Sequence, residues 1–151
     1  MKKLLISGGN GKFATQIKKY NTEYELLAPS AEEMNITNFS QMDKYVSDNK
    51  PDIFIHAAAL TRPLAIHEGQ PSKGIRINII GTSNVVLACM KYNIKLVYIS
   101  TDYVYPGSGG DYNEESPLKP FNKYGWSKLG GESAVMLYDN SLILRVCMNN
   151  K

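Results

Sequence analysis

Short continuous runs of apolar residues alternate along the chain with longer stretches whose apolar residues recur at helical spacing. The continuous runs are typical of strands buried on both faces of a sheet, and they cover residues 3–7, 24–28, 52–59, 94–100 and 142–147. The longer stretches predict helices over residues 13–20, 38–49, 72–92 and 122–138. Because the two patterns alternate throughout, we predict an α/β fold in one domain over residues 1–151: a doubly wound parallel sheet with helices on both faces.

Two local signals refine this pattern. Asn38 stands directly before the second predicted helix, and asparagine is a favoured N-cap residue. Residues 105–120 contain three glycines and three prolines, so they predict a loop between the fourth strand and the last helix. The sequence contains no internal repeat, linker or low-complexity tract.

Composition excludes several classes of function. Hydrophobic residues make up 43% and charged residues 21% of the 151 residues, as in ordinary globular proteins. The net charge of +3 comes from scattered lysines and gives no basic patch for nucleic acid. No apolar run approaches the roughly 20 residues that span a bilayer. The apolar run after the first lysines is too short for a secretory signal, so we expect a cytoplasmic location with no membrane partner.

The two cysteines, Cys89 and Cys147, are far apart and lack the C-x-x-C spacing of metal and redox sites. We therefore expect both to be buried thiols, and we expect no metal site.

A glycine-containing turn follows the first predicted strand. Gly8, Gly11 and Ala14 form the pattern G-x-x-G-x-x-A between that strand and a helix. Glycine lets the backbone approach a pyrophosphate closely, and the helix N-terminus offers unpaired N–H groups to it. The pattern predicts a dinucleotide site, although a tight strand-to-helix turn with no ligand would use the same residues.

The second strand bears on which dinucleotide binds. Dinucleotide sites often place an acidic residue at the end of this strand, where it bonds the ribose 2′-hydroxyl of NAD. Residues 26–30, "LLAPS", contain neither an acid nor an arginine. Lys12 and Ser30 are available for a 2′-phosphate, so NADP is favoured over NAD. The third strand ends in "HAAALT", residues 56–61, whose small side chains leave room for a ligand or pack closely against a helix.

Polar residues with catalytic potential follow the fourth strand. Thr101 and Asp102 end that strand, and Tyr124 and Lys128 stand four apart on the last predicted helix, so they share a face. A lysine ammonium near a phenol lowers the phenol's pKa, and such a tyrosine can give a proton to a carbonyl oxygen. The Thr101 hydroxyl can bond the same oxygen. Taken alone, Y-x-x-x-K also fits a solvated helix face.

Together these motifs resemble the extended short-chain dehydrogenases/reductases, and within them the dTDP-4-dehydrorhamnose reductases. The stretch "STDYVYPGSGGDYNEESPLKPFNKYGWSKLGGE", residues 100–132, is similar to the part of those reductases that runs from the catalytic threonine to the catalytic helix. The resemblance covers nearly the whole chain. It implies a Rossmann-like three-layer αβα fold and reduction of the 4-keto group of a deoxy-sugar nucleotide.

The resemblance also implies roles for individual residues. Thr101, Tyr124 and Lys128 form the catalytic set, and Thr101 and Asp102 face the substrate. Lys128 holds the nicotinamide ribose as well. The implied NADP or NAD site consists of Gly8, Asn10, Gly11, Lys12, Phe13, Asn35, Ile36, Ala57, Ala58, Ala59, Leu60, Thr61, Tyr124 and Lys128. Asn35 replaces an acidic residue common at its position.

Three alternatives accompany this reading. Sugar-nucleotide 4,6-dehydratases carry a glutamate where this chain has Tyr103, which weighs against dehydration. The resemblance implies that the C-terminal substrate-binding domain is not present in this chain, so a non-catalytic cofactor-binding or regulatory subunit is one alternative. A sugar-nucleotide epimerase of the same superfamily is another. The helices over 72–92 and 122–138 would pair two subunits into a homodimer, or simply cover the sheet.

Overall fold

The computed structural model describes residues 1–147, and it is built around one sheet of five parallel strands in the order β2-β1-β3-β4-β5. The strands are β1 (Lys3–Ser7), β2 (Glu25–Leu27), β3 (Ile53–His56), β4 (Lys95–Thr101) and β5 (Ser141–Val146). All four strand pairings are parallel, as in Leu5 beside Phe54 and Tyr98 beside Ile143. The predicted strands and the parallel doubly wound sheet are confirmed.

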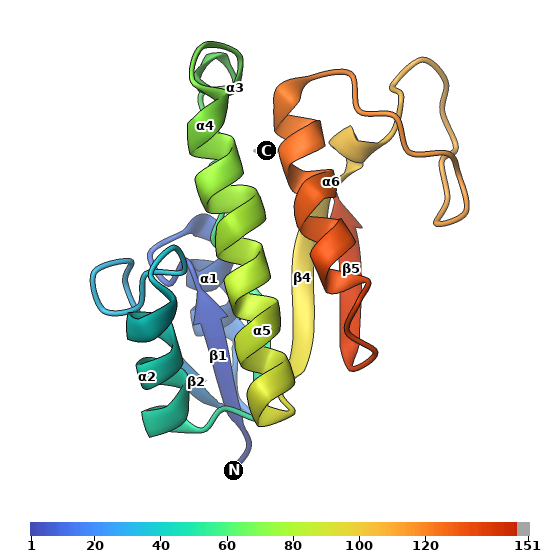
Figure 1. Cartoon of the computed structure of the whole chain (residues 1–151). Helices are drawn as coiled ribbons and strands as arrows, with labels where there is room; N and C mark the ends of the chain where they lie inside the picture. Colours follow the sequence, from blue (N-terminus) through green and yellow to red (C-terminus); the bar gives the residue numbers. More distant parts are fainter. Residues whose placement is uncertain (148–151) are drawn as a thin grey trace.

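Helices cover both faces of this sheet (Figure 1). The helical elements are α1 (Lys12–Tyr20), α2 (Phe39–Asn49), α3 (Ala65–Gly69), α4 (Pro71–Gly74), η1 (Ile75–Gly81), α5 (Thr82–Tyr92), η2 (Asp102–Val104) and α6 (Lys123–Val135). The larger core cluster joins Phe54 and Leu96 of the sheet to Met42, Val85 and Val135 of α2, α5 and α6. On the opposite face, α1 packs against the sheet through Ala14. The Rossmann-like three-layer αβα architecture is therefore confirmed.

The helix predicted over residues 72–92 differs from the observed one. The chain is helical throughout this range, but its middle segment, η1, is a π-helix between α4 and α5. A π-helix accommodates an extra residue per turn, and the spacing of apolar residues alone does not reveal it. The short elements α3 and η2 were also not predicted, because three to five residues are too few to show a helical period.

The helix boundaries follow local hydrogen bonding. The Asn38 side chain accepts a hydrogen bond of 3.2 Å from the Gln41 N–H, so its predicted N-cap role in α2 is confirmed. Asn122 does the same for α6 by accepting from the Gly125 N–H at 2.8 Å. As predicted, residues 105–120 form a loop, and it extends away from the sheet between η2 and α6 (Figure 1).

The two cysteines have different environments. Cys89 lies on the buried face of α5, and burial raises the pKa of its thiol to about 12. Cys147 is exposed, so the expectation that it is buried is wrong: it lies just beyond the end of β5, at the open edge of the sheet. Among residues 1–147, no group of histidine, cysteine or acidic side chains is arranged to hold a metal ion, and no helix is long and apolar enough to cross a membrane.

Candidate functional site

A cavity of about 580 Å³ opens at the carboxyl edge of the sheet. Its walls come from the turn after β1, the segment after β3, the end of β4 and the first turns of α6. The strand order reverses direction between β1 and β3, and open α/β sheets bind ligands at such a switch point. The cavity is therefore in the position where this fold binds a ligand.

Most of the predicted site residues meet at this cavity. Those that line it are Gly8, Gly11, Lys12, Phe13, Ala57, Ala59, Thr61, Thr101, Asp102, Tyr124 and Lys128. Arg62, Leu64 and Val146 also line the cavity, and no role was predicted for them from the sequence. Their types are common at surfaces and strand ends, so only the folded arrangement identifies them.

The remaining predicted cofactor residues lie outside the wall of this cavity: Asn10, Asn35, Ile36, Ala58 and Leu60. The Asn35 side chain closes a local turn by accepting hydrogen bonds from the Thr37 N–H and hydroxyl. Ile36 is buried, 5% exposed, against Gly81. Leu60 is held through its backbone by Asn78. These contacts explain why the side chains of Asn35 and Ile36 do not face the cavity.

The glycine turn has a defined backbone geometry. Gly8 has a φ of +76°, and an added Cβ would lie 3.1 Å from the Ala58 backbone. Gly11 donates its N–H to the Gly8 carbonyl at 2.8 Å. Gly9 was not part of the predicted motif, yet a Cβ there would overlap the Ala28 carbonyl oxygen. All three glycines therefore permit close backbone approach at the start of α1.

Thr101 and Tyr124 are neighbours across the cavity. The Thr101 hydroxyl donates to the Asp102 carboxylate at 3.1 Å and accepts from the Tyr103 N–H at 3.3 Å. The Tyr124 ring packs between His67, with ring centroids 5.1 Å apart, and Tyr103, at 5.7 Å. Burial raises the pKa of the Tyr124 phenol, while hydrogen bonding with Thr101 acts in the opposite direction. The ring is thus fixed by its neighbours, with its hydroxyl directed at Thr101.

Lys128 has partners other than the expected phenol. It is 3% exposed, its Nζ donates to the Ile99 carbonyl at 2.8 Å, and it lies 4.2 Å from the centre of the Tyr98 ring. Burial lowers the pKa of Lys128 to about 7, against the opposing effect of Glu132. The expectation that Lys128 lowers the pKa of Tyr124 is wrong for this structure, because the ammonium lies on the Ile99 carbonyl and burial dominates at the phenol.

The buried side-chain amide of Asn78 links the segments that surround the cavity. Asn78, in the π-helix, accepts from the Leu60 N–H at 2.8 Å and donates to the Leu60 carbonyl at 3.0 Å. Its Nδ2 also donates to the Ser127 hydroxyl of α6 at 2.8 Å. Asn78 therefore joins η1 and the segment after β3 to the helix that carries Tyr124 and Lys128. In the sequence, this role was indicated only by a polar residue, Asn78, within an apolar helical stretch.

His56 forms a second buried polar link. Its Nδ1 lies 2.7 Å from the Ser7 hydroxyl and its Nε2 lies 3.0 Å from the Thr82 hydroxyl. The ring stacks on Tyr98, with centroids 5.4 Å apart. Burial, with a smaller effect of the Lys128 charge, lowers the pKa of His56 to about 3. His56 is therefore a neutral structural group that links β1, β3 and α5.

We expect the free energy of unfolding to fall as pH drops from about 6.5 towards 3. The unfolded chain binds a proton at His56 over this interval while the folded chain does not, so acid favours unfolding by about 1.4 kcal/mol per pH unit. Urea unfolding at several pH values measures this slope. His56→Gln removes the titrating group and should flatten the slope; equal slopes in the two proteins would contradict the assignment.

Comparisons with known proteins identify one family model and several similar relatives. The family model described as "RmlD substrate binding domain" matches residues 1–148. The chain is 33% identical over 150 residues to dTDP-4-dehydrorhamnose reductase of Aggregatibacter actinomycetemcomitans, with 96% of this chain and 51% of the relative covered. It is 32% identical over 156 residues to methionine adenosyltransferase 2 subunit beta of Xenopus tropicalis, with 96% of this chain and 46% of that relative covered.

The chain is also similar to a solved structure of the same kind of reductase. The crystal structure of dTDP-4-dehydrorhamnose reductase from Bacillus anthracis in complex with NADP has a TM-score of 0.90 and 36% identity, covering 96% of this chain and 53% of that one. This chain spans about half the length of the relatives that it matches.

Proposed function

Because this chain belongs to the RmlD substrate binding domain family, we propose that residues 1–151 bind a nicotinamide dinucleotide and support NAD(P)H-dependent reduction of the 4-keto group of a deoxy-sugar nucleotide. The observation that carries the proposal is the meeting of the glycine turn with Thr101, Tyr124 and Lys128 around one cavity. The relative from Aggregatibacter actinomycetemcomitans supports the same reaction.

The residues at the cavity fit a dinucleotide. Because Gly8 and Gly11 have no side chains, a ligand can approach the backbone closely at the start of α1. The N–H groups and the helix dipole there favour a phosphate. Lys12 and Lys128 line the same cavity and supply cationic groups. The Bacillus anthracis relative was solved with NADP, which supports a nicotinamide cofactor here as well.

The side chains divide the chemistry between them. The bound nicotinamide would supply a hydride to the carbonyl carbon of the substrate. Tyr124 would give the phenolic proton to the carbonyl oxygen as negative charge develops there. Thr101 would bond the same carbonyl oxygen; in this structure its hydroxyl donates to Asp102 at 3.1 Å beside the Tyr124 phenol. Lys128, with a pKa of about 7, adds positive charge at the same wall.

The direct test is an assay of the purified chain with reduced cofactor and a dTDP-4-keto-6-deoxy sugar. Oxidation of the cofactor that depends on the sugar supports the reductase proposal. Isomerisation of a sugar nucleotide without net loss of reduced cofactor would instead support an epimerase. Binding of the cofactor with no turnover of either kind would contradict a catalytic role for the isolated chain.

A non-catalytic regulatory subunit is the second candidate function. The similarity to methionine adenosyltransferase 2 subunit beta favours it, since that relative is named as a subunit of another enzyme and is nearly as similar as the reductase. Under this proposal the cavity binds cofactor as a structural ligand. Stabilisation by NADPH without sugar-dependent oxidation, in the chain alone and with added partner enzyme, would support it.

Lys12→Ala is expected to weaken NADPH binding about five- to tenfold while leaving NADH binding nearly unchanged, because loss of one charged phosphate contact costs about 1 kcal/mol. The proposal is that Lys12, with Ser30, receives the 2′-phosphate. The Ser30 hydroxyl accepts from the Glu33 N–H at 3.3 Å, so Lys12 is the sharper test. Cofactor fluorescence titration measures both affinities, with Lys19→Ala at the opposite end of α1 as the control. Equal losses for the two cofactors would contradict the assignment.

We also propose a homodimer through the α5 and α6 face. Leu87 of α5 is 54% exposed and Trp126 of α6 is 53% exposed, both high for large apolar side chains. Two helices that only cover the sheet would not need these residues to be apolar. Sedimentation equilibrium of the chain, and of Leu87→Lys, would show whether this face holds two copies together.

A further inference from the structure

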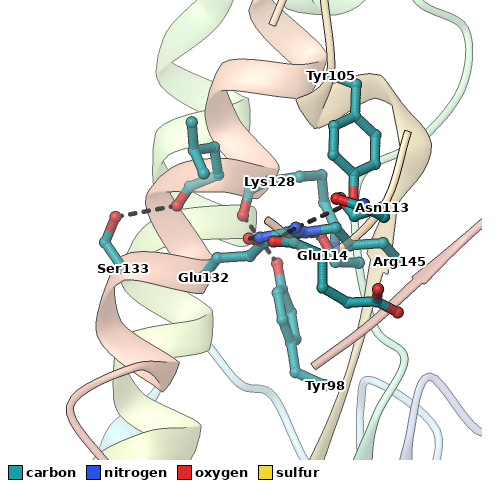
Figure 2. Close-up of polar contacts among 10 residues, drawn as sticks. Tyr98, Tyr105, Asn113, Glu114, Lys128, Glu132, Ser133 and Arg145 are labelled. Carbon is teal, nitrogen blue, oxygen red and sulfur yellow. Dashed lines mark hydrogen bonds and ion pairs between the residues drawn. The ribbon is translucent and has the colours of Figure 1, made fainter. Parts of the chain in front are cut away.

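Glu132 is a buried carboxylate one helical turn beyond Lys128 on α6. It is 2% exposed and accepts a short hydrogen bond from the hydroxyl of Ser100, a residue of the cavity wall. Arg145 of β5 holds both carboxylate oxygens: Nη2 lies 2.9 Å from Oε2, and Nε lies 3.1 Å from Oε1. Figure 2 shows this pair beside Lys128 and Tyr98. A buried carboxylate held by two hydrogen bonds from one guanidinium is a charge-assisted pair with a fixed geometry.

Arg145 also reaches the loop that precedes α6. Its Nη1 donates to the Tyr105 hydroxyl at 3.1 Å and lies 3.5 Å from the Glu114 carbonyl. The Tyr105 hydroxyl donates in turn to the Asn113 carbonyl at 2.9 Å (Figure 2). The Tyr105 ring stacks flat on Tyr112, with centroids 4.9 Å apart. One guanidinium therefore connects the helix carrying Lys128 to residues 105–114 of the loop.

The charges around Lys128 come from several elements. Its surroundings include His56 of β3, Tyr98 of β4, Asp102 of η2, Tyr124 and Glu132 of α6 and, behind Glu132, Arg145 of β5. His56 is neutral near pH 7 because its pKa is about 3, and burial keeps the Tyr98 phenol protonated by raising its pKa. Asp102 is engaged by the Thr101 hydroxyl. Glu132 is therefore the carboxylate on the same helix face as Lys128, and Arg145 is its counter-ion.

We propose that Glu132 and Arg145 are a positioning pair that sets the charge of Lys128 and ties it to the order of loop 105–120. Glu132 favours the protonated form of Lys128, and Arg145 limits this effect by neutralising the carboxylate. The same Arg145 bonds the loop through Nη1, so the charge at Lys128 and the order of the loop depend on one guanidinium. The pair belongs to the site of the proposed reductase, but its role is measured without turnover, so its failure is distinct from failure of the reductase proposal.

The test is the titration of Lys128 followed by NMR of its Cε–Hε signal in the full chain, assigned through Lys128→Arg. We expect Glu132→Gln to lower the titration midpoint by about one pH unit, the lower end of the shift that a neighbouring opposite charge produces, because Glu132 favours the charged form of Lys128. Arg145→Met should raise the midpoint by about the same amount, because it leaves the carboxylate unneutralised. A purely structural role predicts no such opposite shifts.

Two controls separate charge from folding. Asp43→Asn removes a carboxylate that pairs with Lys91 on the far side of α5, and it should leave the Lys128 midpoint unchanged. Arg145→Lys keeps the positive charge but loses the two-pronged hold, so it should return the midpoint towards the unmodified value while hydrogen exchange in residues 105–116 speeds up severalfold. The proposal is overturned if Glu132→Gln leaves the midpoint unchanged, if both main variants shift it the same way, or if Arg145→Lys leaves loop exchange unaltered.

Discussion

Tyr124→Phe is expected to lower sugar-dependent cofactor oxidation by about 10²- to 10⁴-fold, the usual contribution of a positioned general acid. In the proposed reaction, the substitution removes the proton donor and leaves the rest of the side chain in place. The phenyl ring keeps its contacts with His67 and Tyr103, so the wall of the cavity stays in place. Cofactor binding and the free energy of unfolding should therefore remain close to those of the unmodified chain.

The rate is measured from the loss of reduced-cofactor absorbance, and binding from its fluorescence. Tyr20→Phe is the matched control, because Tyr20 lies at the end of α1 with 70% of its surface exposed. A Tyr124→Phe protein that retains its full rate would remove Tyr124 from the chemistry. A protein that loses cofactor affinity in parallel with rate would assign Tyr124 to binding instead.

The sheet and the position of the candidate site were predictable because both follow from short-range patterns. The continuous apolar runs fix which segments become buried strands, and the helices between them force the strands to be parallel. Parallel strands have their carboxyl ends at one edge, so Gly8 after β1 and Thr101 at the end of β4 had to meet there. Tyr124 and Lys128 then needed only helical spacing to join them.

The properties that the sequence did not reveal depend on contacts between distant segments. The pKa of Tyr124 is raised because neighbouring segments bury it, and no local pattern reports burial of a hydroxyl. Lys128 bonds the Ile99 carbonyl, a partner 29 residues away that carries no sequence signature. The Asn78 side chain, in the π-helix, likewise bonds Leu60 and Ser127 of distant segments. Such features become visible only once the layers are packed.

Gly125→Ala tests the packing that sets Tyr124 in place, and it is expected to destabilise the chain by about 2–3 kcal/mol, the upper range for overpacking. A Cβ at Gly125 would overlap the Tyr103 carbonyl oxygen and lie 2.9 Å from the Pro120 Cβ. Helix propensity alone favours alanine by about 1 kcal/mol, so the sign of the result decides which effect dominates. The clash involves backbone that cannot rotate away, so we expect the first turn of α6 to move off η2 and activity to fall with stability.

Urea unfolding of Gly125→Ala beside Gly69→Ala isolates the clash. Gly69 ends α3, and a Cβ there meets nothing within 4 Å, so propensity acts alone and the variant should be as stable as the unmodified chain or up to about 1 kcal/mol more stable. A Gly125→Ala protein at least as stable as Gly69→Ala would show that η2 and α6 are not in fixed contact. Tyr124 would then be positioned by its ring contacts with His67 and Tyr103 and by the hydrogen bond between Asn78 and Ser127.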